Sequence, residues 1–112
     1  MRLIIIALFS LSSINAFATN TSTGKVTIKS VVFYSKQEPT YPAHAGHVQI
    51  HFDAVTWTNG GDCHPTSLVI RPEDTHLVSS VLAALMAGEQ ISIAADDNFK
   101  VNVECIARAI AL

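Results

Sequence analysis

Three histidines stand close together in the first half of the chain, at His44, His47 and His51. Imidazole nitrogens are common ligands of zinc and copper, so this group suggests a metal site. His47 and His51 fall on one face of an expected strand, where four residues span about 13 Å, so they share an ion only if the chain bends. The same residues also fit the solvated face of a strand. Other side chains that can complete a site are Glu38, Gln49 and Asp53.

Cys63 and Cys105 are the only cysteines. In an exported protein a single pair most simply forms a disulfide. Closing the loop between them would stabilise the fold by roughly 4 kcal/mol in the chain-entropy model. The alternatives are two free thiols, or a thiol or metal site that joins Cys63 and His64 to His76. A thiol or metal site of this kind is excluded once Cys63 forms the disulfide.

Aromatic and polar residues near two loops suggest a sugar-binding site. Tyr41 lies in a loop with two prolines, and Trp57 precedes a turn that contains Asn59 and Asp62. Aromatic faces can stack on a sugar ring, and the two polar side chains can bond its hydroxyls. The alternative is that Trp57 belongs to the core. The ligand-binding candidates are therefore Tyr41, Trp57, Asn59 and Asp62.

Motifs for catalysis are lacking. Asp96-Asp97-Asn98 resembles a fragment of a calcium loop but lacks the remaining ligands, so we expect a hairpin turn there. The chain has no Gly-rich phosphate loop, no nucleophile elbow and no paired-cysteine zinc spacing. The sequence thus predicts neither an enzyme nor a cofactor.

The first 18 residues read as a secretory signal peptide, with Arg2, an apolar run over 3–11 and the small-x-small sequence Ala16-Phe17-Ala18. An N-terminal membrane anchor is the alternative. We expect an exported protein, periplasmic or secreted, with one domain over 19–112 and a disordered leader over 19–24. No later segment is long and apolar enough to cross a bilayer. The formal net charge of −2 argues against nucleic acid or an anionic membrane as a partner held by bulk charge.

Alternation of apolar and polar residues predicts five strands, at 25–34, 47–58, around 68–70, 90–95 and 99–112. In the first strand the apolar set changes face near Ser30, which indicates a bulge or bend. Residues 74–88 predict the single helix, with Asp74 or Thr75 as its cap and Gly88 at its end. Its apolar face consists of Leu77, Val78, Val81, Leu82, Leu85 and Met86.

The chain is therefore mainly β with one helix, in the order β-β-β-α-β-β. Strands that change face suit a sheet that bends and closes, so the order fits an OB-fold-like five-stranded barrel. The alternative is an open α+β sheet with the helix on one face.

Four stretches carry a resemblance to known proteins: Gly24-Lys25-Val26, Cys63, residues 77–91 and Cys105-Ile106. With these stretches and this order of elements, the chain resembles the small exported OB-fold binding subunits of bacterial AB-type toxins, and small periplasmic proteins of unassigned role. The resemblance covers most of the chain after residue 18. It implies a non-catalytic binding module able to form a ring of copies, and the glycan-binding residues of the toxin subunits have no local match here.

Two functions follow from these observations. The first is an exported binding module that recognises a protein or glycan partner through its loops or a face of the barrel. The second is a periplasmic metal-binding protein that uses the histidines of the second strand. A small hydrolase ranks behind both, because no arrangement of catalytic residues is recognisable.

Overall fold

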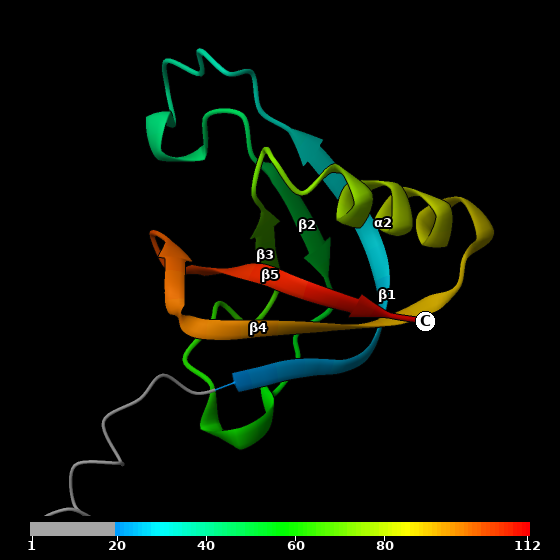
Figure 1. The fold of residues 1–112 in the computed structure, drawn as a ribbon. Helices are drawn as coiled ribbons and strands as arrows, with labels where there is room; N and C mark the ends of the chain where they lie inside the picture. Colours follow the sequence, from blue (N-terminus) through cyan, green and yellow to red (C-terminus); the bar gives the residue numbers. More distant parts are fainter. Residues whose placement is uncertain (1–19) are drawn as a thin grey trace, which may run out of the picture.

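Five strands follow one another around a closed ring in the computed structural model, which describes residues 20–112 (Figure 1). The order of neighbours is β1-β2-β3-β5-β4, and β4 pairs again with β1. All pairs are antiparallel except β3 with β5. The mainly β chain with one helix is thereby confirmed, whereas the predicted signal peptide lies outside the described residues. The elements are β1 (Asn20–Phe33), η2 (Pro42–His44), β2 (Val48–Phe52), η3 (Thr58–Gly60), β3 (Ser67–Ile70), α2 (Thr75–Ala87), β4 (Gln90–Val101) and β5 (Glu104–Ala111).

β1 bends and so pairs with two neighbouring strands. Its first half pairs with β4 and its second half with β2, and the register with β2 shifts between Ile28 and Ser30. The predicted bend near Ser30 is confirmed. The predicted disordered leader is wrong for its described part, because β1 begins at Asn20, which pairs with Asp96. Its polar composition resembles that of a frayed end, but the backbone ladder with β4 holds the segment in place.

The turn between β4 and β5 lies later than the sequence indicates. β4 continues through residues 96–98 to Val101, and the chain turns at Asn102, whose φ is 56°. The hairpin turn predicted at 96–98 is therefore wrong, and the start of the fifth strand moves from Phe99 to Glu104. A register shift between Asp96 and Lys100 shows that these short polar residues form an irregularity inside the ladder.

The second strand is shorter than predicted. β2 ends at Phe52, and the chain then leaves the sheet and forms η3. Trp57, expected inside that strand or at its end, instead packs from this loop into the core with 5% of its surface exposed. Its ring meets Phe52 edge to face with centroids 6.3 Å apart.

Helix α2 packs its buried residues into the core formed by the strands. Gly88 ends it with φ 67°, and its N–H points back to the last helical carbonyls, as predicted. The predicted side-chain cap is absent: the Asp74 carboxylate accepts instead from Arg71 Nε at 3.1 Å. Met86, predicted for the apolar face, is 88% exposed, because it lies on the side of the helix turned away from the buried Leu77, Val81 and Ala84. Within residues 20–112, no helix has the length and apolar character needed to cross a membrane.

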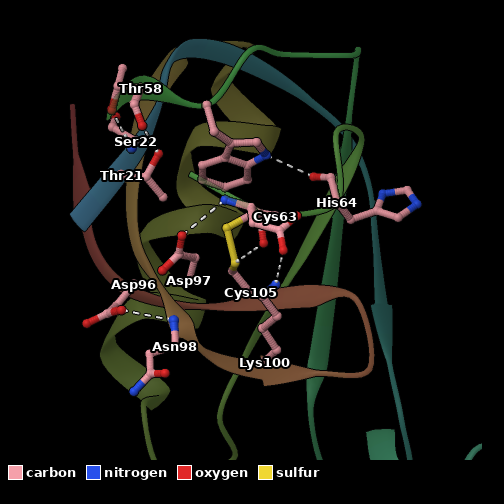
Figure 2. Close-up of a disulfide and its surroundings, with 12 residues drawn as sticks. Thr21, Ser22, Thr58, Cys63, His64, Asp96, Asp97, Asn98, Lys100 and Cys105 are labelled. Atoms are coloured by element: carbon pink, nitrogen blue, oxygen red, sulfur yellow. Dashed lines mark hydrogen bonds and ion pairs between the residues drawn. A yellow bond between two sulfur atoms is a disulfide. The ribbon is translucent and has the colours of Figure 1, made fainter. Parts of the chain in front are cut away.

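The predicted disulfide is confirmed. Cys63, ahead of β3, is bonded to Cys105 in β5, and their Cα atoms are 5.3 Å apart (Figure 2). Beside it, Trp57 Nε1 donates to the carbonyl of His64 at 2.9 Å, and Lys100 Nζ lies 3.0 Å from Asp62 Oδ2. The bridge thus ties the loop between β2 and β3 to the hairpin of β4 and β5.

Candidate functional site

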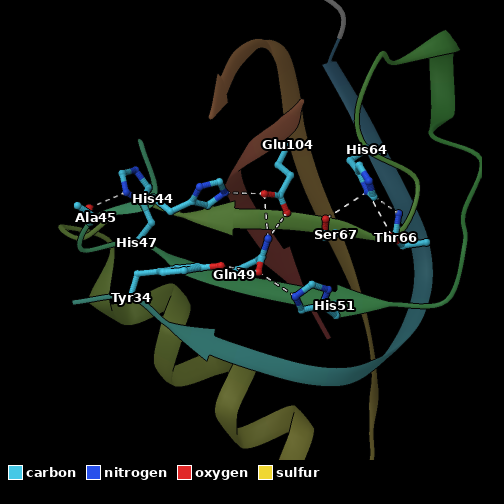
Figure 3. A network of polar contacts seen from close by, with 10 residues as sticks. All are labelled: Tyr34, His44, Ala45, His47, Gln49, His51, His64, Thr66, Ser67 and Glu104. Atoms are coloured by element: carbon cyan, nitrogen blue, oxygen red, sulfur yellow. Dashed lines mark hydrogen bonds and ion pairs between the residues drawn. The ribbon is translucent and has the colours of Figure 1, made fainter. Parts of the chain in front are cut away.

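A cluster of polar side chains occupies the outer surface of the ring where β2, β3 and β5 lie side by side. The core residues Ile50 and Phe52 alternate with Gln49 and His51, so the latter two point outward. His51 pairs with Ser67 in β3. The parallel register of Val69 with Ile106 then brings Ser67 level with Glu104 in β5. We name this group the polar face: Tyr34, His44, Gln49, His51, Ser67 and Glu104 (Figure 3).

Glu104 is the anchor of the polar face. Only 5% of it is exposed, yet its carboxylate accepts from His44 Nε2 at 2.7 Å and from Gln49 Nε2 at 2.8 and 3.0 Å. Burial pushes the pKa of Glu104 up, but hydrogen bonds from Ser67, His44 and Gln49, with the charge of His44, hold that pKa below its ordinary value. The group is therefore a buried carboxylate at neutral pH.

Gln49 connects this anchor to the surface. Its amide nitrogen donates to Glu104, so its Oε1 faces the other way and accepts from Tyr34 at 3.2 Å and from His51 Nε2 at 2.9 Å. His51 therefore carries a proton on Nε2. Burial and the negative charge of Glu104 both raise the pKa of Tyr34, which keeps its hydroxyl protonated as a donor.

His44 holds the loop between β1 and β2 against the polar face. It lies in η2 with 6% exposed, and its Nδ1 is buried with no hydrogen-bond partner within residues 20–112. The rings of Tyr34 and His44 approach with centroids 5.2 Å apart. Tyr41 meets Tyr34 edge to face at 6.3 Å and is itself 56% exposed. The ring of Tyr41 is therefore exposed and is supported from below by the rings of Tyr34 and His44.

The arrangement encloses Ser67 and leaves oriented polar groups at the surface. Ser67 is 3% exposed, and its hydroxyl oxygen lies 3.2 Å from Nδ1 of His64, which also accepts from the backbone N–H of Thr66. A nucleophile needs access to its substrate, and Ser67 has none. The outward groups of Tyr34, Gln49 and His51 are held in defined orientations by one another, as recognition requires.

The predicted metal ligands are not brought to one point. His44 Nε2 contacts Glu104, His47 Nδ1 contacts the carbonyl of Ala45 at 3.0 Å, and His51 Nε2 contacts Gln49. The two carboxylates suggested to complete the site are engaged elsewhere: Asp53 with Lys29, and Glu38 with backbone N–H groups of its own loop. In the described part of the chain, no group of three or more His, Cys, Asp or Glu residues is arranged to hold a metal ion.

The predicted sugar site is divided between the two ends of the ring. Trp57 is buried, so the prediction of a displayed stacking ring is wrong, and its alternative as a core residue is confirmed. Asn59 donates to the carbonyl of Asn20, and Asp62 pairs with Lys100, so both belong to the η3 end. Figure 1 shows the segment around residue 60 at the opposite end from the segment around residue 42, so Tyr41 is separated from the other three candidates.

The remaining alternatives concern Cys63 and Asp96. Cys63 is half of a disulfide, so a thiol or metal site with His64 and His76 is wrong. Asp96 accepts from the backbone N–H of Asn98 at 3.0 Å inside β4, which is a local contact rather than part of a calcium loop.

Sequence reasoning missed Tyr34, Ser67 and Glu104 as site residues. Glu104 carried a usable signal, since a carboxylate next to a cysteine in an apolar strand must find partners when it is buried. Ser67 and Tyr34 have no comparable signal in the sequence, because only the sheet register brings them close to Glu104 and Gln49. Comparison with protein-family models, with curated proteins and with solved structures finds no match to this chain.

Proposed function

We propose that this chain is an exported, non-catalytic binding module of the OB-fold type, which recognises a glycan or protein partner across the polar face. The strand order and the position of α2 between β3 and β4 support an OB-like barrel. OB-folds bind through the face of their second and third strands and the adjoining loops. Gln49, His51 and Ser67 of the polar face lie on those strands, beside the loop that carries Tyr41.

The observation that carries the proposal is the pairing of an exposed aromatic ring with an oriented polar network. Tyr41 offers an apolar ring face with 56% of the residue exposed. Tyr34, Gln49 and His51 offer hydroxyl, amide and imidazole groups whose directions are fixed by the buried Glu104. Stacking combined with directional hydrogen bonds is the chemistry that recognises a sugar ring, so a glycan is the first partner to test.

Export has its own support. The single disulfide joins the only two cysteines, and such bonds persist in oxidising compartments such as the periplasm or the extracellular medium. The bridge is buried at Cys105, whose exposed fraction is 0%. A bond that staples two loops of a small domain suits a protein that folds after export.

A glycan array probed with the exported protein tests the proposal. Binding should be found and should weaken roughly tenfold or more in Tyr41→Ala, equivalent to about 1.4 kcal/mol. Met86→Ala is the matched control, because Met86 is 88% exposed and lies on α2, which contributes no residue to the polar face. If neither glycans nor envelope proteins bind, or if Met86→Ala weakens binding as much as Tyr41→Ala, the proposal fails.

A further inference from the structure

Both arginines of the described chain meet in one place. The parallel pairing of Val69 with Ile106 sets the register of β3 and β5. Arg71 follows Val69 by two positions, and Arg108 follows Ile106 by two positions, so the two side chains continue the same outer row. Like charges placed side by side on neighbouring strands destabilise a sheet. Two guanidinium groups beside one pocket favour an anionic ligand, because each can donate paired N–H bonds to it.

The two arginines line a surface pocket of about 170 Å³. One wall is the ring of Phe99, which is 59% exposed, and the floor is formed by Ile106 and Ala107 of β5. A carboxylate, that of Asp96, completes the lining. The pocket therefore combines two cations, one anion and an apolar ring in a volume that suits a small organic molecule.

The arginines differ in how they are held. Arg71 donates from Nε to Asp74 at 3.1 Å, which orients its guanidinium and leaves its terminal N–H groups for another acceptor. Arg108 makes no ion pair or hydrogen bond with any side chain of residues 20–112. One positioned guanidinium and one uncommitted guanidinium suit a planar carboxylate, which accepts two parallel N–H bonds.

Asp96 narrows the choice of ligand. One of its oxygens accepts from the backbone of Asn98. Its negative charge opposes a dianion such as phosphate, but it can accept a hydrogen bond from a hydroxyl or ammonium group. The opposite wall, Phe99, favours an apolar or aromatic substituent.

We propose that this pocket binds a small organic acid that carries one carboxylate, one neighbouring hydroxyl or ammonium group and an apolar ring. Arg71 and Arg108 hold the carboxylate, Asp96 accepts from the donor group, and Phe99 packs on the ring. The site is separate from the polar face and does not rest on the proposed function. A carboxylate group on a larger ligand, such as an acidic sugar, presents the same carboxylate and neighbouring hydroxyl, with the C–H face of the sugar in place of the apolar ring.

Isothermal titration of the full exported protein with phenyllactate tests this site. Saturable binding should appear and should weaken at least about tenfold in Arg108→Gln, because the paired N–H bonds of one guanidinium are lost. Lys25→Gln removes an equal charge from an exposed lysine on β1 and should leave the affinity unchanged. Raising the salt concentration should weaken binding in the original protein.

Three comparisons decide the outcome. 2-Phenylethanol, which lacks the carboxylate, should not bind, and inorganic phosphate should bind more weakly than phenyllactate. A galacturonate probe that binds with the same dependence on Arg108 would support the acidic-sugar form. Absence of saturable phenyllactate binding up to about 10 mM, equal affinity in Arg108→Gln, or tighter binding of phosphate would overturn the proposal.

Discussion

His44 Nε2 lies 2.7 Å from Glu104 Oε1, a buried contact between residues 60 positions apart in the chain. Their side chains are only 8% and 7% exposed. The contact fastens the loop after β1 to the first residue of β5, and through Gln49 it orients the outward groups of the polar face. The display of Tyr41 therefore depends on a pair that solvent hardly reaches.

Removing the imidazole should loosen this loop. His44→Ala leaves Glu104 buried with Gln49 and Ser67 alone, and we expect a loss of about 2–3 kcal/mol, less than for a buried pair without other partners. Urea unfolding measures the change. His76→Ala, on the exposed side of α2, is the matched control and should change stability by less than about 0.5 kcal/mol. A similar small change in His44→Ala would show that the pair does not hold the loop.

The depressed pKa of Glu104 predicts how stability depends on pH. A carboxyl group whose pKa is lower in the folded than in the unfolded chain stabilises the fold above the unfolded value and loses this effect as pH falls through the folded value. The stability that Glu104 supplies should therefore be full above about pH 4.5, its ordinary pKa, and should decline below it.

Glu104→Gln should flatten this acid-dependent decline while it lowers stability at neutral pH. The melting temperature measured between pH 7 and pH 3 checks the prediction. Glu73→Gln, an exposed carboxylate before α2, should keep the slope of the original protein. Equal slopes in the original protein and in Glu104→Gln would contradict the assignment.

The disulfide should contribute strongly to a domain this small. Cys63 and Cys105 are 42 positions apart, and cross-linking a loop of this length contributes roughly 4 kcal/mol in the chain-entropy model. The double variant Cys63→Ala/Cys105→Ala should lose a comparable amount in urea unfolding. The folded original protein should show no titratable thiol. A double variant as stable as the original protein would show that the disulfide does not stabilise the fold.

Trp57 is the chain's single tryptophan, so its fluorescence reports on one environment. Because it is 5% exposed and bonded to the carbonyl of His64, its emission should be blue-shifted and poorly quenched by acrylamide until the protein unfolds. Trp57→Phe should cost about 1–3 kcal/mol through the lost bond and volume. Strong acrylamide quenching in the folded protein would contradict the burial of Trp57 and would indicate an exposed ring.

Local patterns predicted much of the fold. Apolar patterns predicted all five strands, the bend at Ser30 and the helix, and the count of cysteines predicted the disulfide. Boundaries were less accurate, because residues such as Asp96 to Asn98 suit a turn and an irregular strand equally well. The backbone ladder between β1 and β4, which holds Asn20, has no signature in the side chains.

The site was less predictable for a physical reason. Gln49 and Glu104 meet only because β2, β3 and β5 are neighbours in a defined register. Arg71 and Arg108 likewise become neighbours only through the single parallel pairing of Val69 with Ile106. Patterns along the chain identify faces of strands, but they do not reveal which faces adjoin. Trp57 was ambiguous for another reason, since an aromatic residue beside a loop fits both a core and a displayed position.

The most direct test of the account is an NMR titration of the isotopically labelled exported protein with the partner found by the array. Backbone shifts should concentrate on the outer side of β2, on Ser67 and on the loop that carries Tyr41, and they should disappear in Tyr41→Ala. Shifts concentrated instead around η3 or along α2 would contradict the claim that the polar face is the binding surface.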